Sequence, residues 1–367
     1  MRIRTFAALA LLGGAALHAQ SQAPEAPPPW RQPLEQTIEK LIAVQHVTGL
    51  AVGVVSDGKL AYAHGFGVQS LQTHEPVTER SLFQMASVTK TFVATSILQL
   101  VEEDQIDLDA PLIKYLPYFR LADDRAKAIT IRQLLSHTAG MPDVTDFEWD
   151  KPQYDDEALE RYVRSLSDRT LIAAPGTRFQ YSNIGFEVLA DVIAKVSGES
   201  FEDYVQTHIL TPLGMKHSTL LVREADGKLL CAPHVSDAFG AFAVSKVFPY
   251  NRPHAGSSTL YSNVVDMSRF ALANLARGVL EGEQILNSAS YDLLWTRSPV
   301  AGAPVGLCWF LGMSHGLRTM SHSGGDVGFS TNLVLVPERG VAVIVLSNCT
   351  ADAVRTVTEA ALDLLLR

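Results

Sequence analysis

Residues 84–93 read QMASVTKTFV, a run of small and apolar residues interrupted by one lysine. Lys90 stands three places after Ser87, and in a helix positions three apart lie on one face within reach of each other. Val93, Ile97 and Leu100 continue at helical spacing, so the segment is predicted to form a buried helix. A hydroxyl and an amine then share a buried place, where a neutral lysine can take the proton of a serine and make it a nucleophile.

A structural role for Ser87 as the N-cap of that helix is the alternative. Capping does not call for Lys90, because a cation in the first turn meets the unfavourable end of the helix dipole. A second Ser-x-x-Lys pattern, Ser56 to Lys59, lies across the hairpin turn predicted at residues 57–58 and is interpreted as a turn. Ser87 and Lys90 are therefore the candidate nucleophile and its partner.

Two copies of Tyr-Ser-Asn offer a second candidate. The copy at residues 181–183 follows a Pro-Gly turn, which would place Tyr181 on a loop facing a cleft. The copy at residues 261–263 comes just before a helix pattern, where its serine or asparagine would cap the helix. This context favours Tyr181 over Tyr261, and a half-buried tyrosine bonded to the backbone is the alternative for either.

The third motif is His322-Ser323-Gly324-Gly325, which we expect to form a loop before a strand at residues 331–337. Glycines let a backbone approach a ligand closely, and exposed N–H groups stabilise an oxyanion. Taken alone, the motif is better explained as a loop with a surface histidine. The sequence has no G-x-S-x-G elbow, H-E-x-x-H, P-loop or dinucleotide motif, and its 11 histidines lack ligand spacing, so neither metal nor cofactor is expected.

The net charge of the chain argues against nucleic acid as a partner, and its N-terminal segment predicts export. The net charge of −9, without runs of like charge, lacks the footprint of a nucleic-acid binder. Residues 1–19 resemble a signal peptide, whose apolar core at 6–17 is shorter than the roughly 20 residues of a membrane span. A Pro-rich linker is expected at 20–33, and no later stretch is apolar for long enough to cross a bilayer. The mature protein is therefore expected in the periplasm or outside the cell.

Strand patterns lie at both ends of the remaining chain, and helix patterns lie between them. We predict an α/β fold, with an antiparallel sheet built from both ends, flanked by helices and carrying a large helical insertion. Three well-separated cysteines are interpreted as buried hydrophobes, with one disulfide as the alternative. The expected domain is 34–367, with an α/β part at 34–110 and 300–367 and a helical part at 111–299; the cysteines are Cys231, Cys308 and Cys349.

The three motifs in this order resemble the serine β-lactamase-like, penicillin-binding family, which includes class C β-lactamases, D-alanyl-D-alanine carboxypeptidases and related esterases. The stretches LLSHTAGMPD, APGTRFQYSNIGFEVLADVI and LTPLGMKHST are also similar to that family, so the resemblance covers residues 34–367. It implies an α/β sandwich and a helical region, with the active site in the cleft between them.

The resemblance also implies roles. Ser87 is the acylated nucleophile and Lys90 its amine partner. Tyr181 is the general base and acid, because the family's tyrosine lies in the Pro-Gly-containing stretch before a helix, and Asn183 binds the substrate's carbonyl or amide side chain. The N–H groups of Ser87 and Gly325 form the oxyanion hole.

On the opposite wall, the resemblance places His322 and Ser323, followed by Gly324. Class C β-lactamases typically carry Lys-Thr-Gly here, where the lysine holds a fixed positive charge near the carboxylate of a β-lactam. Histidine, with an ordinary pKa near 6.5, supplies that charge only partly at neutral pH. Acyl transfer is therefore expected, and efficient β-lactam hydrolysis is in question.

The expected function is that of an exported serine hydrolase, which forms an acyl-enzyme with peptide-like amides ending in D-residues or with β-lactams. A carboxylesterase of the same fold is one alternative, because it needs the same groups. A non-catalytic binding or scaffold protein is the other, but it predicts the loss of an essential residue, and none is lost. The partner is thus a small molecule or a peptide.

Overall fold

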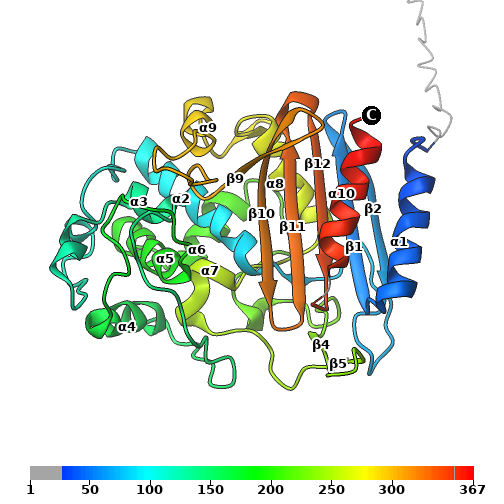
Figure 1. Ribbon diagram of the computed structural model, residues 1–367, viewed down its shortest axis with the longest axis horizontal. Coiled ribbons are helices and arrows are strands. Elements are labelled where there is room, and N and C mark those ends of the chain that lie inside the picture. Colours follow the sequence, from blue (N-terminus) through cyan, green and yellow to red (C-terminus); the bar gives the residue numbers. More distant parts are fainter. Residues whose placement is uncertain (1–26, 351) are drawn as a thin grey trace, which may run out of the picture.

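The computed structural model describes residues 27–350 and 352–367, so the predicted signal peptide and residues 20–26 of the predicted linker lie outside the described residues. A six-stranded antiparallel sheet has the order β2-β1-β12-β11-β10-β9 (Figure 1). Two strands come from the N-terminal part and four from the C-terminal part, which confirms the sheet built from both ends. The strands are β1 (Gly49–Ser56), β2 (Lys59–Gly67), β9 (Phe310–Ser314), β10 (Leu317–Asp326), β11 (Phe329–Val336) and β12 (Val341–Ser347).

The hairpin between β1 and β2 forms where the sequence predicts it. Asp57 and Gly58 have φ angles of +51° and +70°, the left-handed pair that a two-residue hairpin turn requires. Every residue of β12 is buried, because helices cover both faces of the sheet at this point. On one face lie α1 (Arg31–Gln45) and α10 (Ala353–Leu365), and on the other lies α8 (Val264–Leu275) (Figure 1).

The first helix begins earlier than expected. We predicted a linker up to residue 33 and the folded domain from residue 34, whereas α1 begins at Arg31. Pro33 is compatible with this position, because the first turn of a helix leaves its N–H groups unpaired in any case. The linker boundary predicted from proline content is therefore wrong by three residues.

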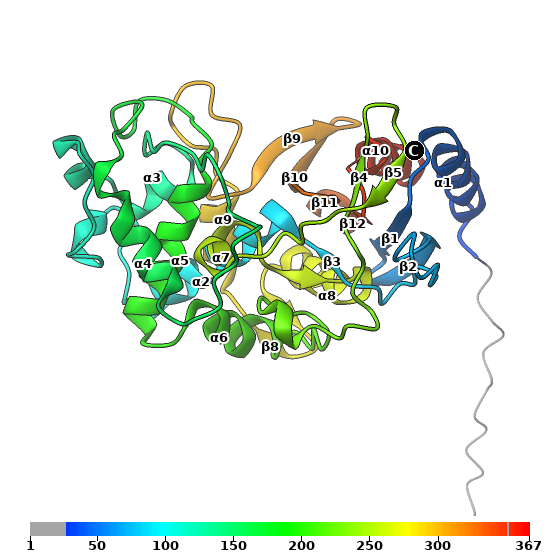
Figure 2. The ribbon, with the colours of Figure 1, turned by 90° about the horizontal axis from the view of Figure 1, so that it is seen from below.

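The region between the two groups of strands is mostly helical, which confirms the predicted insertion. In Figure 2 this region and the sheet lie side by side, and α2 and α7 lie where they meet. The helices are α2 (Thr89–Glu102), α3 (Ile131–Leu135), α4 (Ala158–Ser165), α5 (Asn183–Ser197), α6 (Phe201–Val205), α7 (Ala255–Ser258) and α9 (Ser288–Leu294). The short strands are β3 (Phe83–Gln84), β4 (His234–Ser236), β5 (Phe242–Val244), β6 (Tyr261–Ser262), β7 (Val279–Leu280) and β8 (Glu283–Gln284).

Burial stabilises α2, since most of its residues are buried and the helix is covered on all its faces. The two-residue pairing of β3 with β6 ties the segment before α2 to the segment before α8. Cys231, Cys308 and Cys349 are free and buried, as expected for cysteines used as hydrophobes. Among the described helices, none is both long and apolar enough to span a membrane.

Candidate active site

Ser87 lies in a single 3-10 turn, Ala86–Val88, that leads directly into α2. Ala86 has a φ of +46°, a left-handed conformation that costs a residue with a side chain about 1 kcal/mol or more. The half-buried Ser87 hydroxyl accepts a hydrogen bond from Lys90 Nζ at 3.0 Å. No side chain caps the start of α2, so the N-cap interpretation of Ser87 is wrong.

Lys90 is fully buried, and its amine donates three hydrogen bonds. They go to Ser87 Oγ at 3.0 Å, to Asn183 Oδ1 at 2.7 Å and to the carbonyl oxygen of Ser257 at 3.0 Å. All three acceptors are neutral groups. A buried amine normally requires this complete set of partners, because an unpaired polar group away from water is costly. Lys90 is therefore held in one position, with one N–H aimed at the candidate nucleophile.

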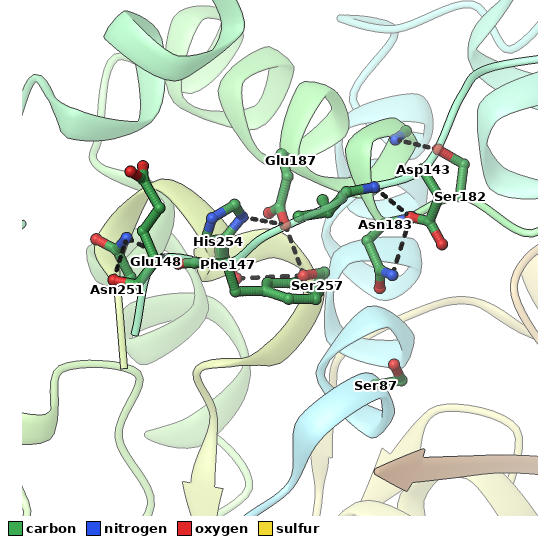
Figure 3. A network of polar contacts seen from close by, with 12 residues as sticks. Ser87, Asp143, Phe147, Glu148, Ser182, Asn183, Glu187, Asn251, His254 and Ser257 are labelled. Carbon is green, nitrogen blue, oxygen red and sulfur yellow. Dashed lines mark hydrogen bonds and ion pairs between the residues drawn. The ribbon is translucent and has the colours of Figure 1, made fainter. Parts of the chain in front are cut away.

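Two carboxylates lie behind the neutral partners of Lys90 (Figure 3). Asp143 Oδ1 accepts from the Asn183 side chain at 3.0 Å and from its backbone N–H at 2.7 Å. Glu187 Oε1 accepts from Ser257 Oγ at 2.6 Å and contacts His254 Nδ1 at 3.2 Å. Each carboxylate thus fixes one of the groups that hold the amine.

Sequence reasoning missed these carboxylates, although each left a signal. Asp143 ends the LLSHTAGMPD stretch at residues 134–143. Glu187 stands four places after Asn183 in α5, so both lie on one helix face, and its charge is flanked by apolar residues on both sides. A buried charge within an apolar helix is the same anomaly that drew attention to Lys90.

Tyr181 lies beside this amine, immediately before α5. Its ring centroid is 5.2 Å from Lys90 Nζ, and the ring stacks on His137 at 4.2 Å between centroids. His137 Nδ1 accepts the backbone N–H of Ser182 at 3.2 Å, which fixes the imidazole plane. Burial, helped by the nearby Lys90, lowers the pKa of His137 well below its ordinary value, so this ring is neutral. His137 therefore supplies a fixed platform for the tyrosine.

The other tyrosine has the structural role that its context suggested. Tyr261 is fully buried in β6, and its hydroxyl donates to the carbonyl of Pro249 at 3.0 Å. Asn263 caps α8 by accepting the N–H of Asp266 at 2.9 Å. The structure therefore places Tyr181 beside the amine of Lys90 and gives Tyr261 a buried structural position.

Replacing each tyrosine by phenylalanine tests this choice. We expect Tyr181→Phe to lower kcat/KM for an ester substrate by about 10²- to 10⁴-fold, the range for a general acid–base group. Tyr261→Phe should change kcat/KM less than about threefold and cost about 1 kcal/mol of stability, because the Pro249 carbonyl still accepts from Gln84 Nε2 at 2.6 Å. Steady-state kinetics and urea unfolding measure both effects. Inactivation by Tyr261→Phe alone would contradict the choice.

The third motif lies in strand β10 and not in the expected loop. Side chains alternate along a strand, so His322 and Gly324 face the helical region while Ser323 faces α10. The exposed Ser323 side chain lines a surface hollow together with Asp352 and Arg355 of the C-terminal part. His322 and Ser323 therefore point to opposite faces of β10, and the Ser323 carbonyl accepts from Nδ1 of the His322 ring at 2.8 Å. That the two residues line the wall opposite the nucleophile stays a prediction.

Gly324 lets β10 approach the candidate nucleophile. A Cβ at this position would lie 2.4 Å from the Met85 carbonyl oxygen and 3.0 Å from the Ser87 nitrogen. Contacts shorter than 3.0 Å essentially never occur, and backbone atoms cannot move aside as a flexible side chain can. Glycine is therefore required where the strand passes the N–H of Ser87.

The register of β10 directs the backbone of Gly325 toward the free edge of the strand. Asp326 pairs with Phe329 across a two-residue turn, so these residues exchange hydrogen bonds, and the next pair, Gly325 with Ser330, does not. On the other side, β9 pairs only with residues 317–321 of β10. The Gly325 N–H is thus available at an open edge beside the N–H of Ser87, as an oxyanion site needs.

His322 is buried, and its electrostatic state differs from the expected one. Burial and the nearby Lys90 lower the pKa of His322 to about 3, so the imidazole is neutral at pH 7. The partial positive charge expected at this position is absent. Since Nδ1–H donates to the Ser323 carbonyl, the buried Nε2 carries the lone pair, and it has no hydrogen-bond partner within the described chain.

This neutral histidine predicts a loss of stability in acid. The folded-state pKa of His322 lies below the unfolded value near 6.5, so its stabilising contribution is complete above pH 6.5 and is lost as the pH falls. One such group removes about 1.5 kcal/mol between pH 6.5 and pH 5. Urea unfolding should show the wild type losing that much more than His322→Gln over this interval. Equal losses would mean that His322 does not titrate in this way.

A serine held by a buried lysine, between an antiparallel sheet and a helical region, is the arrangement of the penicillin-recognising serine hydrolases. The chain belongs to the Beta-lactamase family, whose profile matches residues 34–367. The predicted family, fold and hydrolase class are therefore confirmed.

Three curated relatives show the range of this similarity. Penicillin-binding protein 4 of Amycolatopsis lactamdurans is 31% identical over 326 residues, which cover 86% of this chain and 84% of that protein. Protein flp of Staphylococcus aureus is 25% identical, and Unguisins hydrolase ungD' of Aspergillus campestris is 29% identical. The matches cover 90% and 88% of this chain but only 65% and 62% of those two longer proteins.

Solved structures share the fold. The octameric penicillin-binding protein homologue from Pyrococcus abyssi is 28% identical with a TM-score of 0.81, and the match covers 92% of this chain and 77% of that one. SurE in complex with D-Leu is 26% identical with a TM-score of 0.74, covering 92% of this chain and 75% of SurE. Because each match covers 92% of this chain, the likeness extends beyond the sheet to the helical region.

Proposed function

We propose that this chain is an exported serine peptidase that forms an acyl-enzyme at Ser87 and cleaves peptide-like amides containing D-residues. The observation that carries the proposal is the contact of the fully buried Lys90 amine with Ser87 Oγ at 3.0 Å, held by Asn183 and the Ser257 carbonyl. A lysine amine fixed in this way beside a serine serves to activate it.

In the proposed reaction, Ser87 Oγ attacks the substrate carbonyl, and its proton passes to the oxygen of Tyr181, the general base beside the Lys90 amine. The tetrahedral oxyanion rests on the N–H groups of Ser87 and Gly325, each worth about 10²- to 10³-fold in rate. The carbon–nitrogen bond then breaks, and the amine leaves with a proton from Tyr181. Water attacks the resulting ester by the same route in reverse, which releases the acid and restores Ser87.

Features of the cleft favour a peptide-like substrate. Residues 322–326 of β10 have no strand on their outer side within the described structure, so an extended substrate can bond to this edge as an added strand. The neutral His322 supplies no fixed charge for the carboxylate of a β-lactam, which weighs against efficient β-lactam hydrolysis. Two similar proteins support this substrate class: one is named an unguisins hydrolase, and the other, SurE, was solved with D-Leu bound.

The intact mass of the mature protein, followed after mixing with a penicillin, tests this proposal, with Ser87→Ala as the control. A long-lived adduct on the wild type alone supports peptidase chemistry with slow deacylation. Loss of penicillin without a lasting adduct identifies a β-lactamase. If neither occurs, a panel of short acyl esters decides between the carboxylesterase alternative and a non-catalytic protein.

Export rests on residues 1–19, which lie outside the described part of the chain. We propose the periplasm or the cell exterior as the place of action, because a positive start and a short apolar core direct a chain to secretion. Comparing the mass of the secreted protein with that of the full chain tests this point.

A further inference from the structure

The cleft has two chemically different ends, because β10 runs along it from His322 to Asp326. Tyr181 lies at the His322 end, where the two rings are 6.5 Å apart between centroids and the ring of Phe310 packs beside both, at 6.5 Å and 5.4 Å. The leaving amine needs a proton from Tyr181, so it must occupy this end. The acyl part of the substrate, which stays on Ser87, then extends toward Asp326.

Asp326 faces the cleft. It follows Gly324 by two residues and so lies on the same face of β10, about 7 Å further along at the usual rise of a strand. One carboxyl oxygen accepts the N–H of Val327 at 2.8 Å, and the nearby Trp149 indole and Ser258 hydroxyl stabilise the charged carboxylate. Asp326 therefore crosses from the sheet to the helical region at the acyl end of the cleft.

Trp149 is held firmly at this place. Its segment is fastened by Asn251, whose Nδ2 donates to the Phe147 carbonyl at 3.0 Å (Figure 3). The rings of Phe147 and Trp149 both pack against the buried His254, at centroid distances of 4.8 Å and 5.6 Å. The acyl end of the cleft is thus closed by fixed aromatic side chains, and the carboxylate of Asp326 lies beside them.

This carboxylate lacks a cation. Among the described residues no lysine, arginine or histidine forms an ion pair with Asp326, and Lys90 acts on it only from a distance. Burial raises the pKa of Asp326 to about 6, against the opposite effect of the Val327 N–H, the Trp149 indole and the Ser258 hydroxyl. A half-buried carboxylate without a counter-ion, at the place where substrate binds, is complementary to a positively charged group of the substrate.

We propose that Asp326 determines specificity by binding an ammonium group on the acyl part of the substrate. This inference rests on the proposed acyl-enzyme chemistry at Ser87. The α-amino nitrogen of an acyl residue is about 2.5 Å from its carbonyl carbon, and Gly325, which holds the carbonyl oxygen, is the neighbour of Asp326. The ammonium group is therefore expected first at the free N-terminus of a D-residue, which would make the enzyme an aminopeptidase. An amine at the end of a substrate side chain is the alternative location of the ammonium group.

Boronic acids that bond to the active serine provide the test, because they bind without turnover. The boronic analogue of D-alanine and its N-acetyl derivative are compared as inhibitors of p-nitrophenyl acetate hydrolysis. We expect the free amine to bind the wild type about 10- to 100-fold more tightly than the acetylated form, the value of one charged hydrogen bond. Asp326→Asn should remove most of this ratio. Asp363→Asn, which removes a charge from the exposed face of α10, should keep it.

A pH series adds a readout that a purely structural aspartate would not give. Lowering the pH from 7.5 to 5.5 protonates Asp326, so the preference for the amine should fall in the wild type and stay flat in Asp326→Asn. Lys90 and Tyr261 are the ionisable groups that face Asp326, and both are present in the two proteins. An equal loss of affinity for both inhibitors in Asp326→Asn would show that the residue only supports Trp149, and would overturn the inference.

A second pair of boronic acids distinguishes a side-chain amine from an α-amine as the bound group. The boronic analogue of Nα-acetyl-D-lysine is compared with its diacetyl form. A preference confined to this pair would assign the ammonium to the side chain instead of the α-position. The two proposals fail in different ways. If no ester hydrolysis depends on Ser87, both the acyl-enzyme proposal and the amine-site proposal are overturned. Normal ester hydrolysis with no amine preference overturns the amine site alone.

Discussion

Ser87→Ala is expected to lower kcat/KM for ester and amide substrates by about 10⁴- to 10⁶-fold, since removal of the nucleophile from such a unit leaves only binding and oxyanion stabilisation. Folding should be preserved. The Ser87 side chain is half-buried, so water can accept the hydrogen bond that Lys90 loses, while Asn183 and the Ser257 carbonyl still hold the amine. Steady-state kinetics and a thermal melt measure both outcomes.

The chain offers a matched control in its other Ser-x-x-Lys motif. Ser56 ends β1 at the first hairpin, and its hydroxyl bonds only to the neighbouring Asp57 among the described contacts, at 3.3 Å. Ser56→Ala should leave kcat/KM within about twofold, as expected for a surface substitution far from the cleft. Activity that survives Ser87→Ala at more than a tenth of the wild-type value would remove the nucleophile from the proposal.

Gly324→Ala should cost activity and stability together. The new methyl group would meet the Met85 carbonyl and the Thr331 hydroxyl at 2.4 Å, so β10 must move away from the turn that carries Ser87. Overpacking of this kind costs about 1–3 kcal/mol. Because the oxyanion site needs the N–H groups of Ser87 and Gly325 at fixed separation, kcat should fall by about 10²- to 10³-fold. Kinetics and urea unfolding report the two losses.

Substitution of the neighbouring Gly325 distinguishes the effect of steric crowding at Gly324 from the effect of losing backbone flexibility at a glycine. A Cβ on Gly325 would have no atom within 4 Å, and its N–H survives the substitution. Gly325→Ala should therefore lower kcat only a few-fold and leave stability within about 1 kcal/mol, the usual cost of changing a strand glycine. Similar losses in both variants would mean that β10 tolerates displacement and that close approach at Gly324 is not what limits catalysis.

Local sequence signals were sufficient for much of this protein. Continuous apolar runs predicted the central strands, and Asp57-Gly58 predicted a hairpin because few other pairs adopt two left-handed residues in succession. Lys90 stood out because a cation inside a buried helix conflicts with its surroundings, and such conflicts mark functional sites. The position of the insertion followed from the change of period between the ends of the chain and its middle.

The third motif shows where these signals failed. Gly324 and Gly325 lower the local strand signal, and only pairing with β11 makes the segment a strand, so sequence predicted a loop. The strand pleat then turns Ser323 to the α10 face and His322 into the cleft. Neither direction can be known before the register is known, because a shift of one residue exchanges the two faces.

The sequence by itself determined the strands β1, β2, β11 and β12, the insertion, and the chemical identity of the Ser-x-x-Lys pair, because these depend on neighbours a few residues away. The tertiary structure alone decided the opposite faces of His322 and Ser323, the neutral state of His322, and which carboxylates, Asp143, Glu187 and Asp326, lie around the site. The physical reason is that burial and electric fields depend on distance in space. Lys90 meets Asn183 and Ser257 only after the chain between them has folded.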